Sequence, residues 1–316
     1  MHQIYQTNPF GSYALEQLLT VGTAPPPKDY DDFWQSAYDA VLGIDPKAEF
    51  RDTEKVHQHW RVYDLAFQST QGMTIGGWML VPAHGEPSRA FVVGHGYGGR
   101  DGPDFHLPFA DAALFFPCCR GISRSAVAPI SSDPYWHVIH DIDKKDQYIL
   151  RGCVEDIWLT VSVIEQKFPA LIGKIGYLGI SFSGGVGVMA LSRDTRIARA
   201  HFNVPTFGNH RLRLRIPTMG SGLSVQDFYR RDPHTLIRTL RYYDAANAAA
   251  RIKVPVHFAL ALRDQVVTPP GQFAIYNQVN SEKHLYVLEA GHDSYPTQEQ
   301  QNKELLAELS HFFSQI

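Results

Sequence analysis

Apolar residues recur at helical spacing in two stretches of the chain. In residues 29–42 they follow acidic first-turn residues and lie on one face, which predicts a leading helix. In residues 149–168 the apolar positions are three or four residues apart and predict a longer helix with one buried face. These positions are Ile149, Cys153, Ile157, Val161, Ile164 and Phe168. Cys153 is therefore expected in the core.

Short apolar segments alternate with the helical patterns. Residues 62–69 and 74–81 flank a Gln71-Gly72 turn signal and predict paired strands. Further strands are predicted over residues 89–95, 175–180, 199–204, 254–262 and 284–289, and further helices over residues 184–191 and 298–313. The apolar stretch 111–119 leads into a stretch without periodicity that ends at Asp141. Strands that alternate with helices predict an α/β fold, with a mostly parallel central sheet and helices on both faces.

The chain shows little sign of division into separate domains. Its 316 residues could form two domains or one large α/β domain. No repeat or low-complexity tract is present, and the nearest thing to a linker, residues 24–28, comes too early to separate two domains. We expect a single domain over residues 1–316, with an N-terminal helical and strand extension over about residues 1–60.

Composition narrows the function classes. The chain has 29 basic and 32 acidic residues, a formal net charge of −3, so we expect no nucleic acid partner and no binding to anionic lipid. Three cysteines, two of them adjacent, exclude a disulfide framework. The first residues lack the basic and apolar regions of a signal peptide, and no stretch approaches the roughly 20 apolar residues of a membrane span. We expect a cytoplasmic protein.

A candidate nucleophile follows the predicted strand 175–180. Ligands bind at the carboxyl ends of the strands in such sheets, and Ser181 stands at this position within Gly179-Ile180-Ser181-Phe182-Ser183. A serine at a sharp strand-to-helix turn is the nucleophile elbow, whose usual pattern is G-x-S-x-G. Ser183 replaces the last glycine, but the glycines that follow it still allow the helix to approach the sheet closely.

A second serine has the same local pattern. Ser123 lies within Gly121-Ile122-Ser123-Arg124-Ser125. The prolines that follow it prevent the helix that an elbow requires, so we reject Ser123 as the nucleophile.

Two further side chains complete a catalytic arrangement. A serine hydroxyl needs a base, and the base needs an orienting carboxylate, which in this type of sheet follow in the order Ser, Asp, His. Asp264 and His292 each come just after a predicted strand, so they can reach Ser181 at one edge of the sheet. The oxyanion of the reaction would be bound by the backbone N–H groups of Phe182 and Tyr97.

Two alternative sites were weighed against this one. Residues 94–99 spell G-x-G-x-x-G after a strand, as in dinucleotide-binding proteins, but a poor helix start follows, and Arg120 stands near the place of the acidic ribose ligand. Arg120 could instead favour a 2′-phosphate, so a nucleotide-binding module remains an alternative. His137, His140 and Asp141 are ligand-type residues without zinc-site spacing. We expect no metal and no cofactor.

The chain resembles the acetyl xylan esterase and cephalosporin C deacetylase family of α/β-hydrolases, carbohydrate esterase family 7. The resemblance runs from residues 26–34 to the C-terminal helix, and its matching stretches are residues 76–82, 92–99, 241–256 and 268–277. It implies an α/β-hydrolase fold, acetylated sugars as substrates and a ring-like homo-oligomer, a hexamer. It also implies the following roles: Ser181 as nucleophile, Asp264 and His292 as its partners, and the amides of Tyr97 and Phe182 as oxyanion donors.

Three motifs depart from the family pattern. Ile122 stands where the family usually has glutamine in Arg-Gly-Gln, and Asp293 stands where it has glutamate after the histidine. Phe182 and Ser183 replace the glutamine and glycine of G-x-S-Q-G. Phe182 thereby puts an apolar side chain in place of an amide beside the nucleophile, which bears on the substrate.

Together the motifs predict a serine esterase that hydrolyses short acyl esters, such as acetyl esters, of a small acylated molecule through an acyl-enzyme on Ser181. A carboxylesterase, thioesterase or small peptidase on the same three residues is the alternative within the hydrolases. Phe182 and Tyr97 are expected to close the acyl side to long chains. If these aromatic rings pack into the core instead, the pocket is left open.

Overall fold

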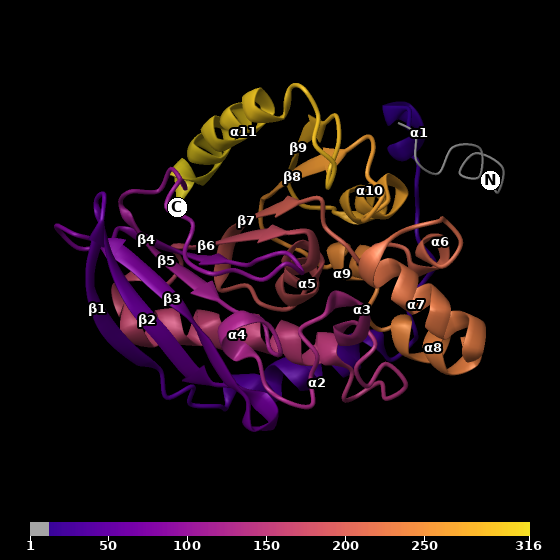
Figure 1. Ribbon diagram of the computed structural model, residues 1–316, viewed down its shortest axis with the longest axis horizontal. Coiled ribbons are helices and arrows are strands. Elements are labelled where there is room, and N and C mark those ends of the chain that lie inside the picture. Colours follow the sequence, from indigo (N-terminus) through magenta and orange to yellow (C-terminus); the bar gives the residue numbers. More distant parts are fainter. Residues whose placement is uncertain (1–12) are drawn as a thin grey trace.

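The structure, a computed structural model, describes residues 13–316. In this part of the chain nine strands form one sheet in the order β1-β2-β3-β5-β4-β6-β7-β8-β9 (Figure 1). The strands are β1 (Glu49–His57), β2 (Trp60–Gln68), β3 (Thr74–Pro82), β4 (Arg89–Val93), β5 (Ala112–Pro117), β6 (Ile175–Ile180), β7 (Ile197–Asn203), β8 (Val256–Ala261) and β9 (Lys283–Leu288). The pairs β1–β2, β2–β3 and β3–β5 are antiparallel. The pairs β5–β4, β4–β6, β6–β7, β7–β8 and β8–β9 are parallel. The predicted, mostly parallel sheet is confirmed.

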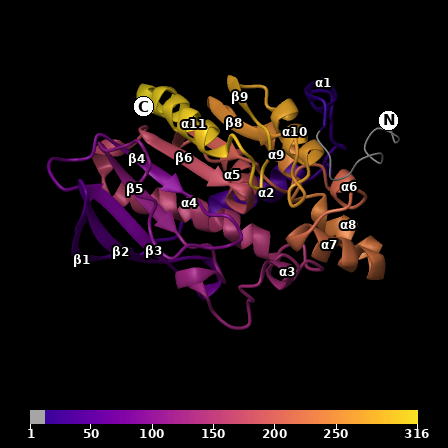
Figure 2. The same ribbon diagram turned by 45° about the horizontal axis from the view of Figure 1, so that its top comes forward.

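Helices cover both faces of this sheet (Figure 2). One face packs against α2 (Tyr30–Leu42), α4 (Ile149–Lys167), α5 (Ser181–Leu191), α9 (Ala245–Ala249) and α10 (Pro269–Gln278). The other face packs against α11 (Gln298–Phe312). The remaining α-helices of the described residues are α1 (Leu15–Leu18), α3 (Pro134–His137), α6 (His210–Arg213), α7 (Gly220–Arg231) and α8 (Pro233–Leu240). Of these, α3, α6, α7 and α8 lie together beyond one end of the parallel strands (Figure 1).

The core divides into two layers because successive strand residues point to opposite faces. In β4, Ala90 and Val92 belong to the layer under α4, whereas Phe91 and Val93 belong to the layer under α11. A strand that is buried on both faces needs apolar residues at every position. This explains the continuous apolar runs from which the central strands were predicted.

Some elements differ from the sequence prediction. The strand β1 was not predicted, because it is an edge strand with mostly exposed, polar side chains and no alternation. The strand β5 lies in the apolar stretch 111–119, to which the pattern assigned no element. The predicted helices over residues 29–42 and 149–168 are confirmed as α2 and α4, and Cys153 is buried as expected.

The N-terminal extension predicted over about residues 1–60 lies partly outside the described residues. From residue 13 onward it contains α1, α2 and β1. Trp34 of α2 is fully buried, and its Nε1–H donates a 2.8 Å hydrogen bond to the carbonyl oxygen of Tyr242. Helix α2 is thus packed on the α4 side of the sheet, whereas β1 belongs to the sheet itself. That the whole chain is one domain stays a prediction.

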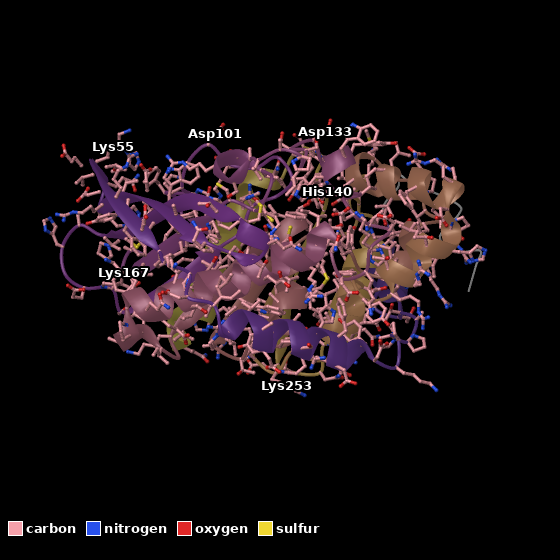
Figure 3. The ribbon with its side chains drawn as sticks, turned by 90° about the horizontal axis from the view of Figure 1, so that it is seen from below. Lys55, Asp101, Asp133, His140, Lys167 and Lys253 are labelled. Carbon is pink, nitrogen blue, oxygen red and sulfur yellow. The ribbon has the colours of Figure 1, made fainter. Side chains whose placement is uncertain are left out.

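Charged side chains lie on the surface of the molecule, and its cysteines are unpaired. Lys55, Lys167 and Lys253 project from separate places around the surface (Figure 3). The three cysteines are free thiols. No helix within residues 13–316 combines the length and the apolar character that crossing a bilayer requires.

Candidate active site

Ser181 stands at a sharp turn between β6 and α5. The strand ends at Ile180 and the helix begins at Ser181, whose φ of +52° lies in the left-handed region. The neighbouring glycines leave room for this turn. A Cβ atom at Gly179 would lie 2.5 Å from the carbonyl oxygen of Ser183, and one at Gly184 would lie 2.9 Å from the Cα atom of Pro205. The predicted strand-to-helix turn is present, and α5 begins three residues earlier than the predicted helix.

Ser181, His292 and Asp264 form one chain of hydrogen bonds. The Ser181 Oγ lies 2.9 Å from His292 Nε2, and His292 Nδ1 lies 2.7 Å from Asp264 Oδ2. Because a carboxylate only accepts, Nδ1 carries the proton and Nε2 presents its lone pair to the hydroxyl. The structure therefore brings together the three side chains that the sequence selected from separate loops.

Asp264 is held by more donors than His292 alone. Its Oδ1 accepts hydrogen bonds of 2.9 Å from the N–H groups of Val266 and Val267. Its Oδ2 also accepts a 3.2 Å bond from Gln272 Nε2, and the carboxylate is fully buried. These donors fix the carboxylate, so that it can hold the His292 ring in one orientation.

The backbone at Gly291 leaves space for this contact. A Cβ atom at Gly291 would lie 2.0 Å from Asp264 Oδ2, closer than any side chain allows. A glycine directly before His292 is thus a requirement of the Asp264–His292 pair.

The loop after β4 lies against the start of α5. A Cβ atom at Gly96 would lie 3.8 Å from the Cβ of Ser181, which places the Gly96–Tyr97 peptide next to the serine. His95 braces this loop: its Nδ1 lies 2.7 Å from the carbonyl oxygen of Gly96, and its Nε2 accepts a 2.9 Å bond from the N–H of Cys119. Burial lowers the pKa of His95 to about 4, so the ring is neutral and can accept at Nε2.

The N–H of Phe182 lies in the first turn of α5, where no intrahelical acceptor exists. It directly follows the serine in the chain and is free to bind a group outside the helix. That the N–H groups of Phe182 and Tyr97 bind the oxyanion stays a prediction.

Comparison with known proteins assigns the chain that carries this site to a family. The sequence model of the acetyl xylan esterase (AXE1) family matches residues 11–310. The chain belongs to the acetyl xylan esterase family. As a member of this family it is a carboxylic ester hydrolase, a serine esterase that acts on acetyl esters, and the resemblance found in the motifs is confirmed.

Solved structures agree on the fold. Acetyl xylan esterase 1 from Thermoanaerobacterium sp. JW/SL YS485 is similar with a TM-score of 0.79 at 22% identity, over 95% of this chain and 99% of that chain. The acetyl xylan esterase from Paenibacillus sp. R4 gives a TM-score of 0.82 at 23% identity, over 94% and 99%. An acylaminoacyl peptidase from Pyrococcus horikoshii gives 0.64 at 16% identity, over 81% of this chain and 41% of that chain. At such identities the likeness shows the fold alone, the predicted α/β-hydrolase fold.

The aromatic side chains at this acetyl xylan esterase family site are not arranged as predicted. Phe182 and Tyr97 were expected to close the acyl side of the pocket. The Phe182 ring is fully buried and packs 4.1 Å from the ring of Tyr97, measured between centroids, and 6.0 Å from that of Phe207. Tyr97 is only partly buried. The Phe182 side chain is therefore part of the core, and the Tyr97 ring packs on it and on the buried His137.

The alternative sites have other contacts. Ser123 lies in a short 3-10 helix, and its hydroxyl accepts a 3.0 Å bond from the N–H of Arg100, whereas His292 is bonded to Ser181. The glycine loop 94–99 is followed by no helix anywhere in residues 94–111, so the element that holds a dinucleotide pyrophosphate is missing.

The candidate metal ligands His137, His140 and Asp141 do not converge on a common point. His137 is buried, with Nε2 2.9 Å from the carbonyl oxygen of Arg120. Burial lowers the pKa of His137 to about 4. His140 lies 3.8 Å from its neighbour Asp141. Within residues 13–316 no cluster of three or more His, Cys, Asp or Glu side chains has the arrangement of a metal site.

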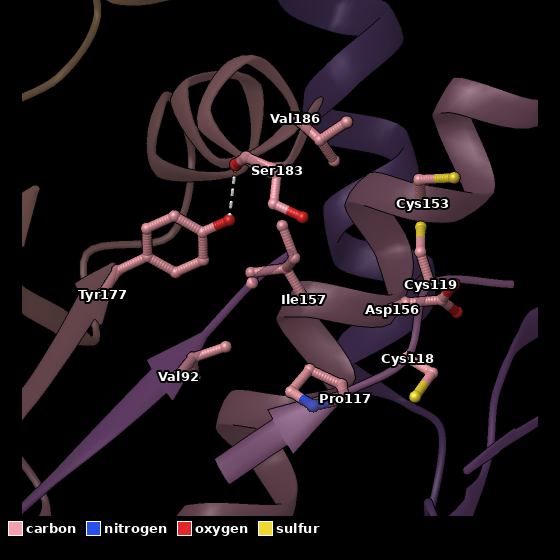
Figure 4. A pocket seen from close by; sticks show the side chains of 11 residues that line it. Val92, Pro117, Cys118, Cys119, Cys153, Asp156, Ile157, Tyr177, Ser183 and Val186 are labelled. Atoms are coloured by element: carbon pink, nitrogen blue, oxygen red, sulfur yellow. Dashed lines mark hydrogen bonds between the residues drawn. The ribbon is translucent and has the colours of Figure 1, made fainter. Parts of the chain in front are cut away.

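Beneath the turn a small cavity of about 20 Å³ separates the elbow from α4 (Figure 4). The Cys119 side chain points toward Cys153 at its border, and the Tyr177 hydroxyl donates a 2.6 Å bond to the carbonyl oxygen of Ser183 (Figure 4). A space of this size holds about one water molecule, not a substrate.

Sequence reasoning missed three supporting residues of the site: Gln272, Gly291 and His95. Gln272 lies within a stretch that matches the family, residues 268–277, but nothing in the pattern shows that it reaches Asp264. Gly291 directly precedes His292 and could have been noticed for that reason.

Proposed function

We propose that Ser181 is the nucleophile of this esterase and that the enzyme removes short acyl groups, acetyl above all, from sugar-like alcohols. The observation that carries the proposal is the continuous chain from Ser181 Oγ through His292 to Asp264, with distances of 2.9 and 2.7 Å. The printed names of the two similar acetyl xylan esterases support an acetylated carbohydrate as the substrate class.

The first half of the reaction forms an acyl-enzyme. His292 Nε2 takes the proton of the Ser181 hydroxyl while Oγ attacks the ester carbonyl carbon. The carbonyl oxygen becomes an oxyanion, which the N–H groups of Tyr97 and Phe182 stabilise by hydrogen bonds. The intermediate collapses when His292 returns the proton to the leaving alcohol oxygen.

The second half releases the acid. A water molecule gives a proton to His292 Nε2 and attacks the acyl carbon, and the proton then returns to Ser181 Oγ as the ester bond to the serine breaks. Asp264 stabilises the imidazolium that forms in both halves without taking the proton itself.

Covalent labelling tests the proposal. A fluorophosphonate probe should form an adduct on Ser181, located by peptide mass mapping, and acetylated sugars at saturating concentration should slow the labelling. An adduct on Ser123 or no adduct would contradict it. A panel of matched oxygen esters, thioesters and amides separates the esterase from the thioesterase and peptidase alternatives.

We further propose a cytoplasmic homo-oligomer, a hexamer as in the resembling family. The free cysteines support a reducing compartment, and a charged fraction of only 19% leaves room for a buried interface. Light scattering at micromolar concentration should report an oligomer, and a monomer would contradict the assembly.

A further inference from the structure

Arg213, the last residue of α6, carries a guanidinium without a hydrogen-bond or ion-pair partner within residues 13–316. Its Nη1 atom is buried and forms no hydrogen bond, and the side chain forms no ion pair within residues 13–316. Asp244 is the acidic residue whose charge acts on it most directly, but that carboxylate already accepts bonds of 2.9 to 3.0 Å from the N–H groups of Asn209, His210 and Ala246. The positive charge of Arg213 is therefore not balanced by a contact in the protein.

The surroundings of Arg213 are the loops of the candidate active site. Its Cζ lies 5.2 Å from the ring centroid of Phe207, which packs on Phe182 next to the serine. Its charge acts on the phenol of Tyr97, whose N–H is an oxyanion donor in the proposed mechanism. A Cβ atom at Gly271, in the first turn of α10, would lie 3.9 Å from Arg213 Cγ. Arg213 thus stands where the loops after β4, β7 and β8 meet.

An unpartnered guanidinium in this place is costly for the fold. Burial lowers the pKa of Arg213, yet a guanidinium stays protonated in proteins, so the charge remains. The cation–π contact with the Phe207 ring offsets only part of the free energy that the guanidinium loses with its hydration shell. Of its nitrogens only Nη1 is fully buried without a partner, and the residue keeps part of its surface exposed, so an anion can approach from the Nε–Nη2 edge.

The neighbouring histidine does not compete for an anion. His210, one turn earlier in α6, donates from Nε2 to the carbonyl oxygen of Tyr243 at 2.9 Å, and its buried Nδ1 has no partner. Burial lowers the pKa of His210 to about 4, so this ring is neutral and offers a lone pair. The anion-binding group on this face of α6 is Arg213.

We propose that Arg213 binds a carboxylate of the ester substrate and makes the enzyme selective for carboxylate-bearing esters. A guanidinium fits a carboxylate with two parallel hydrogen bonds, which a neutral hydroxyl cannot reproduce. The inference rests on the proposed function, because it takes Ser181 as the reacting residue. The carboxylate can belong to the acyl half, as in a succinyl ester, or to the alcohol half, as in an acetylated hydroxy acid or sugar acid.

Two pairs of matched esters tell these sources apart. For the acyl half, kcat/KM is compared between 4-nitrophenyl hydrogen succinate and 4-nitrophenyl butyrate. For the alcohol half, it is compared between 4-acetoxybenzoate and its methyl ester. We expect the wild type to prefer the carboxylate ester by about tenfold or more in one pair, the effect of a charge-assisted hydrogen bond in a site that is partly closed to water.

Variants at position 213 test whether Arg213 causes the preference for the carboxylate ester. Arg213→Gln should bring the ratio in that pair close to one, with most of the change in KM, and Arg213→Lys should keep part of the preference. Arg211→Gln, which changes an exposed arginine of the same short helix, should leave the ratio unchanged. A purely structural arginine would lower kcat/KM for both esters of the pair by the same factor.

Several outcomes would overturn the inference: no preference in either pair, a preference that survives in Arg213→Gln, or equal losses for both esters. If Arg213→Gln does not fold, competitive inhibition of the wild type decides. In that case 4-hydroxybenzoate or succinate monoamide must inhibit better than the neutral amides 4-hydroxybenzamide and succinamide, and equal inhibition rejects the site. If Ser181→Ala still hydrolyses these esters, the proposed function has failed instead, whatever the ratios are.

Discussion

The hydroxyl of Ser183 donates a 2.6 Å hydrogen bond to the backbone carbonyl oxygen of His95, and the Ser183 N–H donates a 3.3 Å bond to the same oxygen. Both bonds join the first turn of α5 to the loop that carries Tyr97. A Cβ atom at Gly94 would lie 2.4 Å from the Cβ of Ser183, so the glycine makes room for the serine. The residue that breaks the family's G-x-S-x-G pattern therefore links the two backbone segments that would bind the oxyanion.

The link at Ser183 predicts a kinetic effect. Ser183→Ala should lower kcat about three- to tenfold with little change in KM, because the Tyr97 N–H loses part of its fixed position, and should cost about 1 kcal/mol of unfolding free energy. Ser192→Ala is the matched control: it removes a buried hydroxyl of the same helix region, bonded at 2.6 Å to the carbonyl oxygen of Met189. Equal kcat values for the two variants would show that Ser183 supports only the fold.

Gly291 gives a second test of the geometry. Gly291→Ala should reduce kcat/KM by about a hundredfold or more, because the new Cβ must push Asp264 or the loop of His292 out of register. Gly102→Ala adds a methyl group where no atom lies within 4 Å and should leave the activity unchanged. Near-normal activity of Gly291→Ala would mean that the Asp264–His292 contact is not needed.

Three buried histidines should make stability depend on pH. Burial lowers the pKa values of His95, His137 and His210 to about 4, from 6.5. Between pH 6.5 and 4 the unfolded chain binds more protons than the folded one, so the free energy of unfolding falls as the pH falls through this window and is constant above it for these groups. From pH 7.5 to 5 each histidine should contribute a loss of about 2 kcal/mol.

Urea unfolding at pH 7.5 and pH 5 measures this loss. His137→Gln should make the difference between the two values smaller by about 2 kcal/mol. His84→Gln, a change at an exposed position, should not alter it. The same unfolding free energy at both pH values in the wild type would contradict the assignment of neutral buried rings.

The enzyme should prefer esters with short acyl chains. The chain belongs to the acetyl xylan esterase family, so 4-nitrophenyl acetate or propionate should be hydrolysed with higher kcat/KM than the octanoate. An open apolar channel would gain about 0.8 kcal/mol for each methylene, so rates would then rise with chain length. A maximum at octanoate or beyond in a series from acetate to decanoate would show that the buried Phe182 leaves a deep pocket open.

The sheet was predictable from the sequence where burial on both faces leaves a clear pattern. Residues 90–93 are apolar throughout because each of them faces one of the two cores. The edge strand β1 has no such pattern, and neither have the four-residue helix α6 and the five-residue helix α9. Their positions depend on tertiary contacts, such as the caps that Asp244 and Asn209 provide, more than on periodicity.

The site was predictable for residues whose chemistry and place in the chain agree. Ser181, His292 and Asp264 each follow a strand, and strands of a parallel sheet bring their carboxyl ends together. The orientation of Phe182 was not predictable, because the same residue could line a pocket or join the core. Arg213 was missed as well, since its unpartnered nitrogen is visible only after folding has placed it.

The central claim, that Ser181 and not Ser123 forms the acyl-enzyme, is tested most directly by kcat on 4-nitrophenyl acetate for two single variants. Ser181→Ala should lose several powers of ten in kcat, and Ser123→Ala should retain nearly all of it. Circular dichroism should show both variants folded. An active Ser181→Ala, or a Ser123→Ala variant that is folded but inactive, would contradict the assignment.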